Sequence, residues 1–175
     1  MATLCLYIFG FSIASGRLDA GTGALTLFGA VQITMFAGAL RAGEAITRAR
    51  ALGALVAFSG LVVLFAGGGA RVSPSGLGFM ALAGVGWGLY SLNGRGTTAP
   101  IRATALNFTL ACGPAALWLA LTPAAPFAPW GIWPALASGA LTSGLGYALW
   151  YAILPQLAAT RAAVAQLTVP LIAAL

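Results

Sequence analysis

The sequence contains no histidine and no lysine, and its only acidic residues are Asp19 and Glu44. Histidine is the commonest metal ligand and the commonest general base, so its absence argues against a metal site and against acid–base catalysis. The two cysteines, Cys5 and Cys112, both lie in apolar stretches. A thiol there packs as a small hydrophobic group, and a disulfide or metal site is the less favoured alternative. We therefore expect no metal and no other cofactor.

Charge is scarce overall, because 6% of the residues are charged and 61% are hydrophobic. A soluble domain has about 25% charged and about 45–50% apolar residues. A soluble fold of about 150 residues still exposes roughly 30% of the surface of its unfolded chain, so it could not bury this much apolar area. The composition predicts that lipid is the solvent for much of the chain.

Apolar stretches recur along the chain at lengths that suit a bilayer, which a helix of about 20 residues can cross. Short breaks with charge, glycine or proline separate them, and short links place consecutive helices antiparallel. Both ends of the sequence fall within apolar stretches, as expected for a piece of a longer bundle. The fold class predicted is an all-α membrane protein, a polytopic bundle of about seven transmembrane helices. The predicted helices are 2–16, 20–40, 50–68, 75–94, 103–122, 131–153 and 157–175.

The eight arginines predict the orientation. A formal charge of +6 can indicate nucleic-acid binding, but these arginines stand singly between apolar runs. Six of them lie in the links around 41–50, 95–102 and 154–161, and the other links carry two. Cytoplasmic links are enriched in basic residues, so we place these three links in the cytoplasm of a multi-pass inner (plasma) membrane protein. Trp130 and Trp133 then fall at the outer interface, where tryptophan commonly anchors a helix.

A faint internal repeat relates 18–33 to 157–172. Each segment follows an aromatic-rich helix, "YIFGFSIAS" or "YALWYAIL". The first segment starts on the outside and the second on the inside, and repeats of opposite orientation are common in secondary transporters. The identical pairs are Leu18/Leu157, Ala20/Ala159, Ala24/Ala163 and Ile33/Ile172.

Two stretches resemble a known family. The first runs from "GALTLFGAVQITM" through a Gly43–Glu44 link pair to a glycine-rich helix with Gly53 and Gly60. The second is "LASGALTSGLGYALWYAILPQLAATRAAVAQLTVPLIAAL", which includes Pro170. Both are similar to EamA-type transporters of the drug/metabolite transporter superfamily. The chain departs from the pattern where Val31–Gln32 replaces a proline and where no second glycine–glutamate link occurs.

The resemblance implies a ten-helix fold in two inverted halves of five helices, with both termini inside the cell. Residues 1–69 would supply helices three to five of the first repeat, and 74–175 would supply helices six to nine of the second. Helices one, two and ten would be missing. The implied function is transport of small metabolites or drugs by alternating access, with export of amino acids or related compounds as the narrower expectation.

Aromatic residues in mid-helix are the first candidates for solute binding. Trp87 and Tyr90 share one helix, and Trp87 lies too far from either interface to be an anchor. Tyr147, Trp150 and Tyr151 follow at i, i+3 and i+4, which places them on one helix face. Aromatic faces in a cavity can hold apolar or cationic solutes by stacking and cation–π contact. Tight packing or interface anchoring is the alternative interpretation of the same pattern.

Uncharged polar residues inside helices are the second group, namely Gln32, Asn107, Gln166 and Thr168. They suit helix-to-helix hydrogen bonds or solute recognition, and the sequence leaves both open. Pro170 is expected to kink the last helix and free a carbonyl group. The full set of candidate substrate-binding residues is Gln32, Trp87, Tyr90, Asn107, Tyr147, Trp150, Tyr151 and Gln166.

Small residues at helical spacing are expected to let helices approach closely. They form two groups, Gly84, Gly86 and Gly88 in one helix and Gly139, Ser143 and Gly146 in another.

The charged residues near the links have simple expected roles. Glu44 is expected to pair with Arg41 or Arg48 of its own link. Arg161 is expected to snorkel to the inner face, with an anionic substrate as the alternative partner. Neither acid is at mid-membrane, so the sequence does not support proton or sodium coupling.

Three classes of function can be compared. An intramembrane enzyme would need histidine, paired acids or metal ligands at depth, so we expect the protein not to be an enzyme. A transporter is favoured, and a non-transporting membrane scaffold or an inactive truncated product is the alternative. The expected partners are a small solute and the lipid bilayer, with a homodimer as a further candidate and no nucleic acid.

Overall fold

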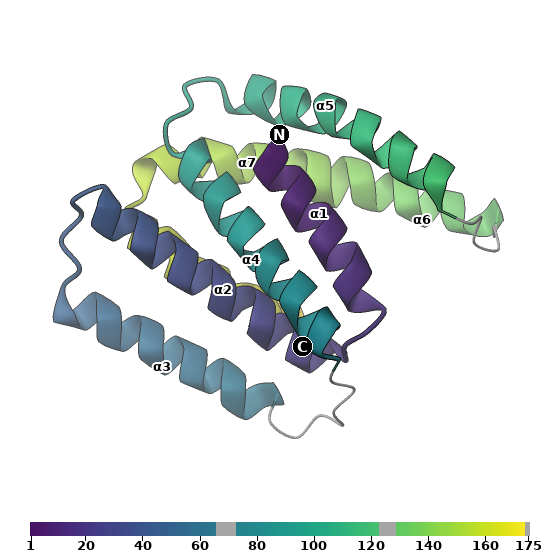
Figure 1. The fold of residues 1–175 in the computed structure, drawn as a ribbon. Coiled ribbons are helices and arrows are strands. Elements are labelled where there is room, and N and C mark those ends of the chain that lie inside the picture. The colour runs from purple at the N-terminus through teal and green to yellow at the C-terminus, as the bar shows by residue number, and fades with distance from the viewer. Residues whose placement is uncertain (66–72, 123–128, 174–175) are drawn as a thin grey trace.

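The computed structural model describes residues 1–65, 73–122 and 129–173, and every regular element in these ranges is helical (Figure 1). This confirms the predicted all-α class. The α-helices are α1 (Ala2–Ser15), α2 (Ala20–Arg41), α3 (Arg48–Phe65), α4 (Pro74–Gly94), α5 (Pro100–Leu121), α6 (Ile132–Ala137), α7 (Gly146–Ile153), α8 (Ala159–Gln166) and α9 (Thr168–Ala173).

The last two predicted helices differ from the structure in their continuity. The helix predicted over 131–153 runs from a 3₁₀ turn at Pro129–Gly131 to a second one at Leu154–Gln156, with a π-helical segment at Ser138–Leu145 between α6 and α7. The helix predicted over 157–175 is interrupted, because α8 ends at Gln166 and α9 starts at Thr168. Pro170 cannot donate a hydrogen bond to the carbonyl group of Gln166, and the interruption at this place agrees with the kink expected from the sequence.

Local signals set both ends of α2. Asp19 is its N-cap and accepts a hydrogen bond from the backbone N–H of Thr22 at 2.8 Å. At the other end Gly43 has φ +72°, a left-handed conformation that glycine adopts without a Cβ penalty. The N–H of Gly43 bonds the carbonyl group of Leu40, and that of Glu44 bonds Ala39. This Schellman motif ends the helix and fixes the position of Glu44.

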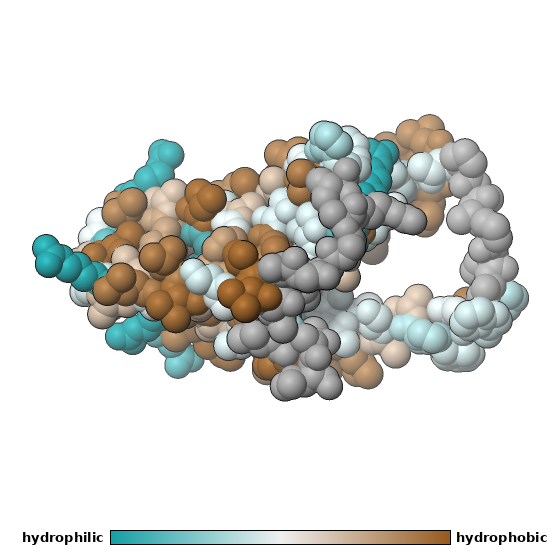
Figure 2. All heavy atoms as spheres, turned by 90° about the horizontal axis from the view of Figure 1, so that it is seen from below, coloured by the Kyte–Doolittle hydropathy of each residue, from teal (hydrophilic) through white to brown (hydrophobic). Residues whose placement is uncertain are grey.

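Consecutive long helices run in opposite directions along the bundle, as short links require (Figure 1). The α2–α3, α4–α5 and α7–α8 links all lie at the left-hand end of Figure 1, and these are the three arginine-rich links. Figure 2 shows hydrophilic residues gathered mainly at the same end. That this end faces the cytoplasm stays a prediction. Arg71, which the sequence places in another link, lies outside the described residues.

The sides of the bundle are apolar. Three helices, α2, α4 and α5, are long and apolar enough to cross a membrane, and α1 is a shorter apolar helix. Large side chains such as Ile33 and Leu119, each 74% exposed, point outward from these helices. Water would disfavour such a surface, whereas lipid tails solvate it. Trp130 is 80% exposed at the start of the 129–156 segment, as an interfacial anchor would be.

Helix α4 lies between α1 and α2, and its glycines allow this arrangement (Figure 1). A Cβ on Gly84 would lie 2.5 Å from the carbonyl oxygen of Leu27 in α2. A Cβ on Gly86 would lie 2.7 Å from the backbone nitrogen of Tyr7 in α1, while Gly88 faces α2 again. The predicted close packing through this glycine series is confirmed.

The second small-residue group behaves differently. A Cβ on Gly139 or Gly146 would meet no atom within 4 Å among the described residues. The expectation that these residues press against a neighbouring helix is therefore wrong for the two glycines. They lie at or beside the π-helical segment, and Gly146 lines a cavity instead.

Candidate functional site

A cavity of about 480 Å³ lies among α1, α2, α4, α7 and the α8–α9 pair. Five of its lining residues are aromatic and come from four helices, and none of them is charged. Pockets of this size and apolar character commonly hold small molecules. The lining residues are Tyr7, Leu27, Phe28, Trp87, Thr142, Gly146, Tyr147, Trp150, Ala165, Gln166, Thr168 and Val169.

Trp87 is the centre of the aromatic wall. Its ring centroid lies 5.0 Å from that of Tyr7 and 4.8 Å from that of Tyr147, with the rings tilted in both pairs. Aromatic rings favour tilted or offset pairs at these separations, and each pair adds about 0.5–1.5 kcal/mol beyond area burial. The wall is therefore a packed assembly of rings from α1, α4 and α7.

The indole N–H groups and the glutamine amide of the wall already have protein partners. The indole N–H of Trp87 donates to Oε1 of Gln166. The Nε2 of Gln166 donates to the Sδ of Met35 at 3.0 Å and to the carbonyl oxygen of Ala162 at 3.3 Å. The indole N–H of Trp150 donates to Oγ of Ser91 at 3.1 Å. Because these groups are satisfied, the wall presents ring faces in fixed orientations.

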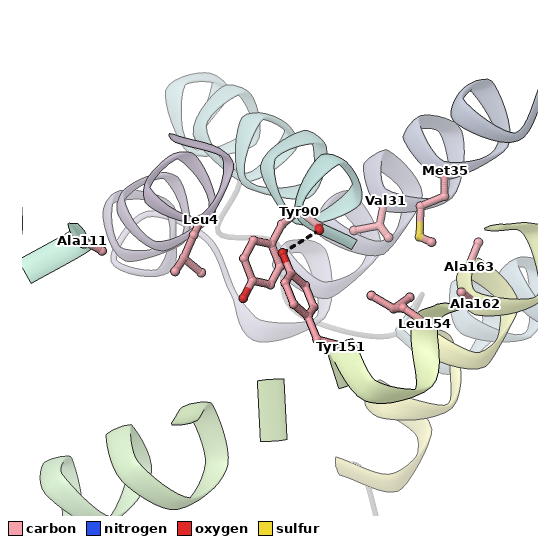
Figure 3. Packing of buried hydrophobic residues seen from close by; sticks show 9 residues of the cluster. All are labelled: Leu4, Val31, Met35, Tyr90, Ala111, Tyr151, Leu154, Ala162 and Ala163. Carbon is pink, nitrogen blue, oxygen red and sulfur yellow. Dashed lines mark hydrogen bonds between the residues drawn. The ribbon is translucent and has the colours of Figure 1, made fainter. Parts of the chain in front are cut away.

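The neighbouring tyrosines form a buried seam beside the cavity (Figure 3). The rings of Tyr90 and Tyr151 stack with centroids 4.5 Å apart, and both side chains are buried. The hydroxyl group of Tyr151 donates to the carbonyl oxygen of Tyr90 at 3.0 Å. Tyr147 and Trp150 line the cavity, whereas Tyr151 joins α7 to α4. The aromatic trio of α7 thus contributes to both a cavity wall and a packed seam.

The structure brings half of the predicted substrate-binding residues into this cavity. Gln32 is buried in α2, away from the lining, and its amide atoms have no hydrogen-bond partner among the described residues. Asn107 is half-buried on α5 and does not line the cavity. The residues inside the lining are Trp87, Tyr147, Trp150 and Gln166, and those outside it are Gln32, Tyr90, Asn107 and Tyr151.

Several lining residues were not identified from the sequence. Tyr7 belongs to the aromatic-rich segment "YIFGFSIAS", which the repeat comparison paired with the segment of Tyr147, so a signal for it existed. Phe28 stands alone among small and aliphatic residues. Thr142 and Val169 also lack a local pattern, because only helix packing places them at the cavity.

The predicted pairing of Glu44 with an arginine of its own link is wrong. Its carboxylate pairs with the guanidinium of Arg95 in the α4–α5 link, not with Arg41 or Arg48 of its own link. It also accepts the backbone N–H of Ala159 at 3.1 and 3.3 Å, at the first residue of α8. The Nε of Arg95 donates in turn to the carbonyl oxygen of Leu157 at 3.1 Å. One carboxylate therefore joins all three arginine-rich links.

The family model described as the EamA-like transporter family matches residues 74–175, which is more than half of the chain. The chain belongs to the EamA-like transporter family. This EamA-like chain is also 46% identical over 175 residues to a protein of Pseudomonas aeruginosa that is described as uncharacterized. The match covers 99% of the chain and 61% of that relative's length. No solved structure matches.

Membership confirms the coarse expectations for this EamA-like chain. It is a helical integral membrane protein of a transporter family, and the family is not one of enzymes. The matched region starts at Pro74, the first residue of α4.

Proposed function

We propose that the protein carries small metabolites across the inner membrane by alternating access, and that the aromatic cavity holds the solute during passage. The observation that carries this proposal is the convergence of Tyr7, Trp87, Tyr147 and Trp150 from three helices on one uncharged cavity. A structural core would fill such a space, since interiors are close-packed with few voids larger than a water molecule.

The proposed solutes are amino acids or related compounds, and the proposed direction is export. The ring faces suit an apolar or aromatic side chain, because stacked rings exclude water and fix orientation. The hydroxyl groups of the lining tyrosines add polar atoms at the wall. No lining residue of the described chain is charged, so charged groups of a solute would meet other parts of the whole protein.

The proposed architecture is the ten-helix inverted repeat of the family, with 1–69 and 74–175 contributing helices three to five and six to nine. The weak repeat between 18–33 and 157–172 and the alternating arginine-rich links support it. The three arginine-rich links are proposed to face the cytoplasm.

Transport by the full-length protein in proteoliposomes tests the function. We expect counterflow of radiolabelled phenylalanine or leucine that competes with aromatic amino acids. Absence of counterflow for any amino acid, nucleobase or cationic dye would overturn the proposal in favour of a non-transporting scaffold. Trp87→Phe retains a ring but removes the donor to Gln166, so it should raise the KM for transport while the protein still inserts.

A further inference from the structure

A second concave site, a groove of about 420 Å³, lies between the first turns of α3 and α8 at the arginine-rich end. It is separate from the aromatic cavity, although both include Ala165. Its lining includes two arginines, Arg50 and Arg161, and the hydroxyl-bearing residue Thr160. We call this site the α3–α8 groove and infer that it binds the phosphate headgroup of an anionic phospholipid.

The arginines of the groove occupy an unfavourable position in their helices. Arg50 is the third residue of α3 and Arg161 is the third residue of α8, and neither first turn contains an acid. The N-terminal end of a helix carries a partial positive charge, so cations there are destabilising and anions are stabilising. The carboxylate of Glu44 already binds the N–H of Ala159 at the start of α8, so a bound anion would chiefly offset the charge of the two arginines that face the groove.

No acid of the described chain neutralises these arginines. Glu44 is the acid at this end of the described chain, and Arg95 and the N–H of Ala159 already occupy its carboxylate. The guanidinium of Arg50 is held by the carbonyl oxygen of Ala45 at 3.1 Å, and its remaining donors are left for a ligand. Guanidinium groups bind phosphate oxygens with particular strength because their N–H donors match the geometry.

Thr160 provides an independent indication of a ligand. Its side chain is 1% exposed, lines the groove, and its hydroxyl oxygen has no hydrogen-bond partner among the described residues. A buried hydroxyl without a partner costs free energy, so a polar group of a ligand is the expected partner. A phosphate oxygen between the two arginines would accept this hydrogen bond.

The rest of the groove favours a lipid over a free anion. Its other lining residues include Ala49, Gly53 and Ala165, all of them small and exposed on the side of the bundle. An acyl chain can lie along such a surface beside the helices, while the headgroup stays at the level of the arginines. Basic pockets between transmembrane helices on the cytoplasmic side are typical sites for anionic headgroups.

Lipid binding by the purified full-length protein tests this inference without measuring transport. The protein in neutral detergent is titrated with phosphatidylglycerol or phosphatidylcholine, and retained lipid is counted by native mass spectrometry alongside the melting temperature. We expect retention of phosphatidylglycerol and a rise in Tm that phosphatidylcholine does not reproduce. The double variant Arg50→Gln/Arg161→Gln should bind phosphatidylglycerol roughly 30-fold more weakly, given the contribution of each basic residue near anionic lipid.

The matched control is Arg41→Gln/Arg102→Gln, which removes two arginines from the same end but outside the groove. If this control weakened phosphatidylglycerol binding as much as the groove variant does, the effect would be one of general charge, and the assignment of the groove as the site would be overturned. If millimolar inorganic phosphate alone gave the full rise in Tm, and phosphatidylglycerol raised Tm no further, the lipid assignment would be overturned. If the glutamine variant does not fold, Thr160→Val should still weaken binding severalfold, and unchanged binding would refute the inference.

Discussion

The carboxylate of Glu44 lies 2.5 Å from the guanidinium of Arg95 and also accepts a hydrogen bond from the N–H of Ala159, the first residue of α8. Both side chains are largely sheltered from solvent. The Schellman motif at Gly43 positions the acid, so the glycine and the glutamate of this pair act together. The pair joins the α2–α3, α4–α5 and α7–α8 links at one end of the bundle.

Glu44→Gln should destabilise the protein by about 1–3 kcal/mol, because it leaves Arg95 without its anion and weakens the cap of α8. The measurement is Tm in detergent, with Arg95→Gln and the double variant completing a cycle. We expect the double variant to be less destabilised than the sum of the two single variants. Strict additivity would show that the two side chains do not interact.

Gly43→Ala isolates the backbone part of the same junction. Alanine in the left-handed conformation costs about 1–2 kcal/mol, so the variant should lower Tm even though no side-chain contact is removed. Gly43→Asn should lower it less, because asparagine tolerates this conformation. Equal effects of both substitutions would argue against this backbone explanation.

Tyr151→Leu and Tyr147→Leu should separate the packed seam from the cavity wall. Tyr151→Leu removes the stacking on Tyr90 and the hydrogen bond to its carbonyl group, so we expect a loss of about 2–4 kcal/mol in stability and less protein in the membrane. Tyr147→Leu should leave membrane expression near normal and change solute preference in transport assays, because Tyr147 lines the cavity. Normal expression of the first variant with altered transport would reverse this assignment.

Gly84→Ala should disrupt the contact between α4 and α2. The added Cβ would lie 2.5 Å from the carbonyl oxygen of Leu27, and backbone cannot move away cheaply, so about 1–3 kcal/mol of stability should be lost. Gly139→Ala is the matched control, since its Cβ would meet nothing within 4 Å among the described residues. We expect the control to match the wild-type Tm or exceed it slightly, as alanine favours helix.

Asp19 should make the start of α2 sensitive to acid. Hydrogen bonds from the backbone N–H and then the hydroxyl group of Thr22 lower the pKa of this carboxyl below its ordinary value of 3.8. A lowered pKa in the folded state means that the stabilising contribution is fully present above the ordinary value and is lost as pH falls through the lowered one. Wild type should therefore exceed Asp19→Ala in Tm at pH 7, and this difference should shrink as the pH falls below about 3.8. A constant difference between pH 7 and pH 2.5 would contradict the capping role.

The sequence by itself determined the solvent, the helices and their alternation. Low charge and long apolar stretches predict lipid-exposed helices because burial of that much apolar surface in water is not possible at this length. Arginine placement predicted which links share an end, and Gly84, Gly86 and Gly88 predicted a close helix contact. Each of these signals is local, so it can be read along the chain.

The partners of individual side chains were decided only by the tertiary structure. Glu44 is close in sequence to Arg41 and Arg48, but the turn that ends α2 places its carboxylate beside Arg95 instead. Tyr147 and Tyr151 share a helix face by spacing, yet one lines a cavity and the other packs against Tyr90. Contacts of this kind depend on which helices lie side by side, and residues distant in sequence set that arrangement.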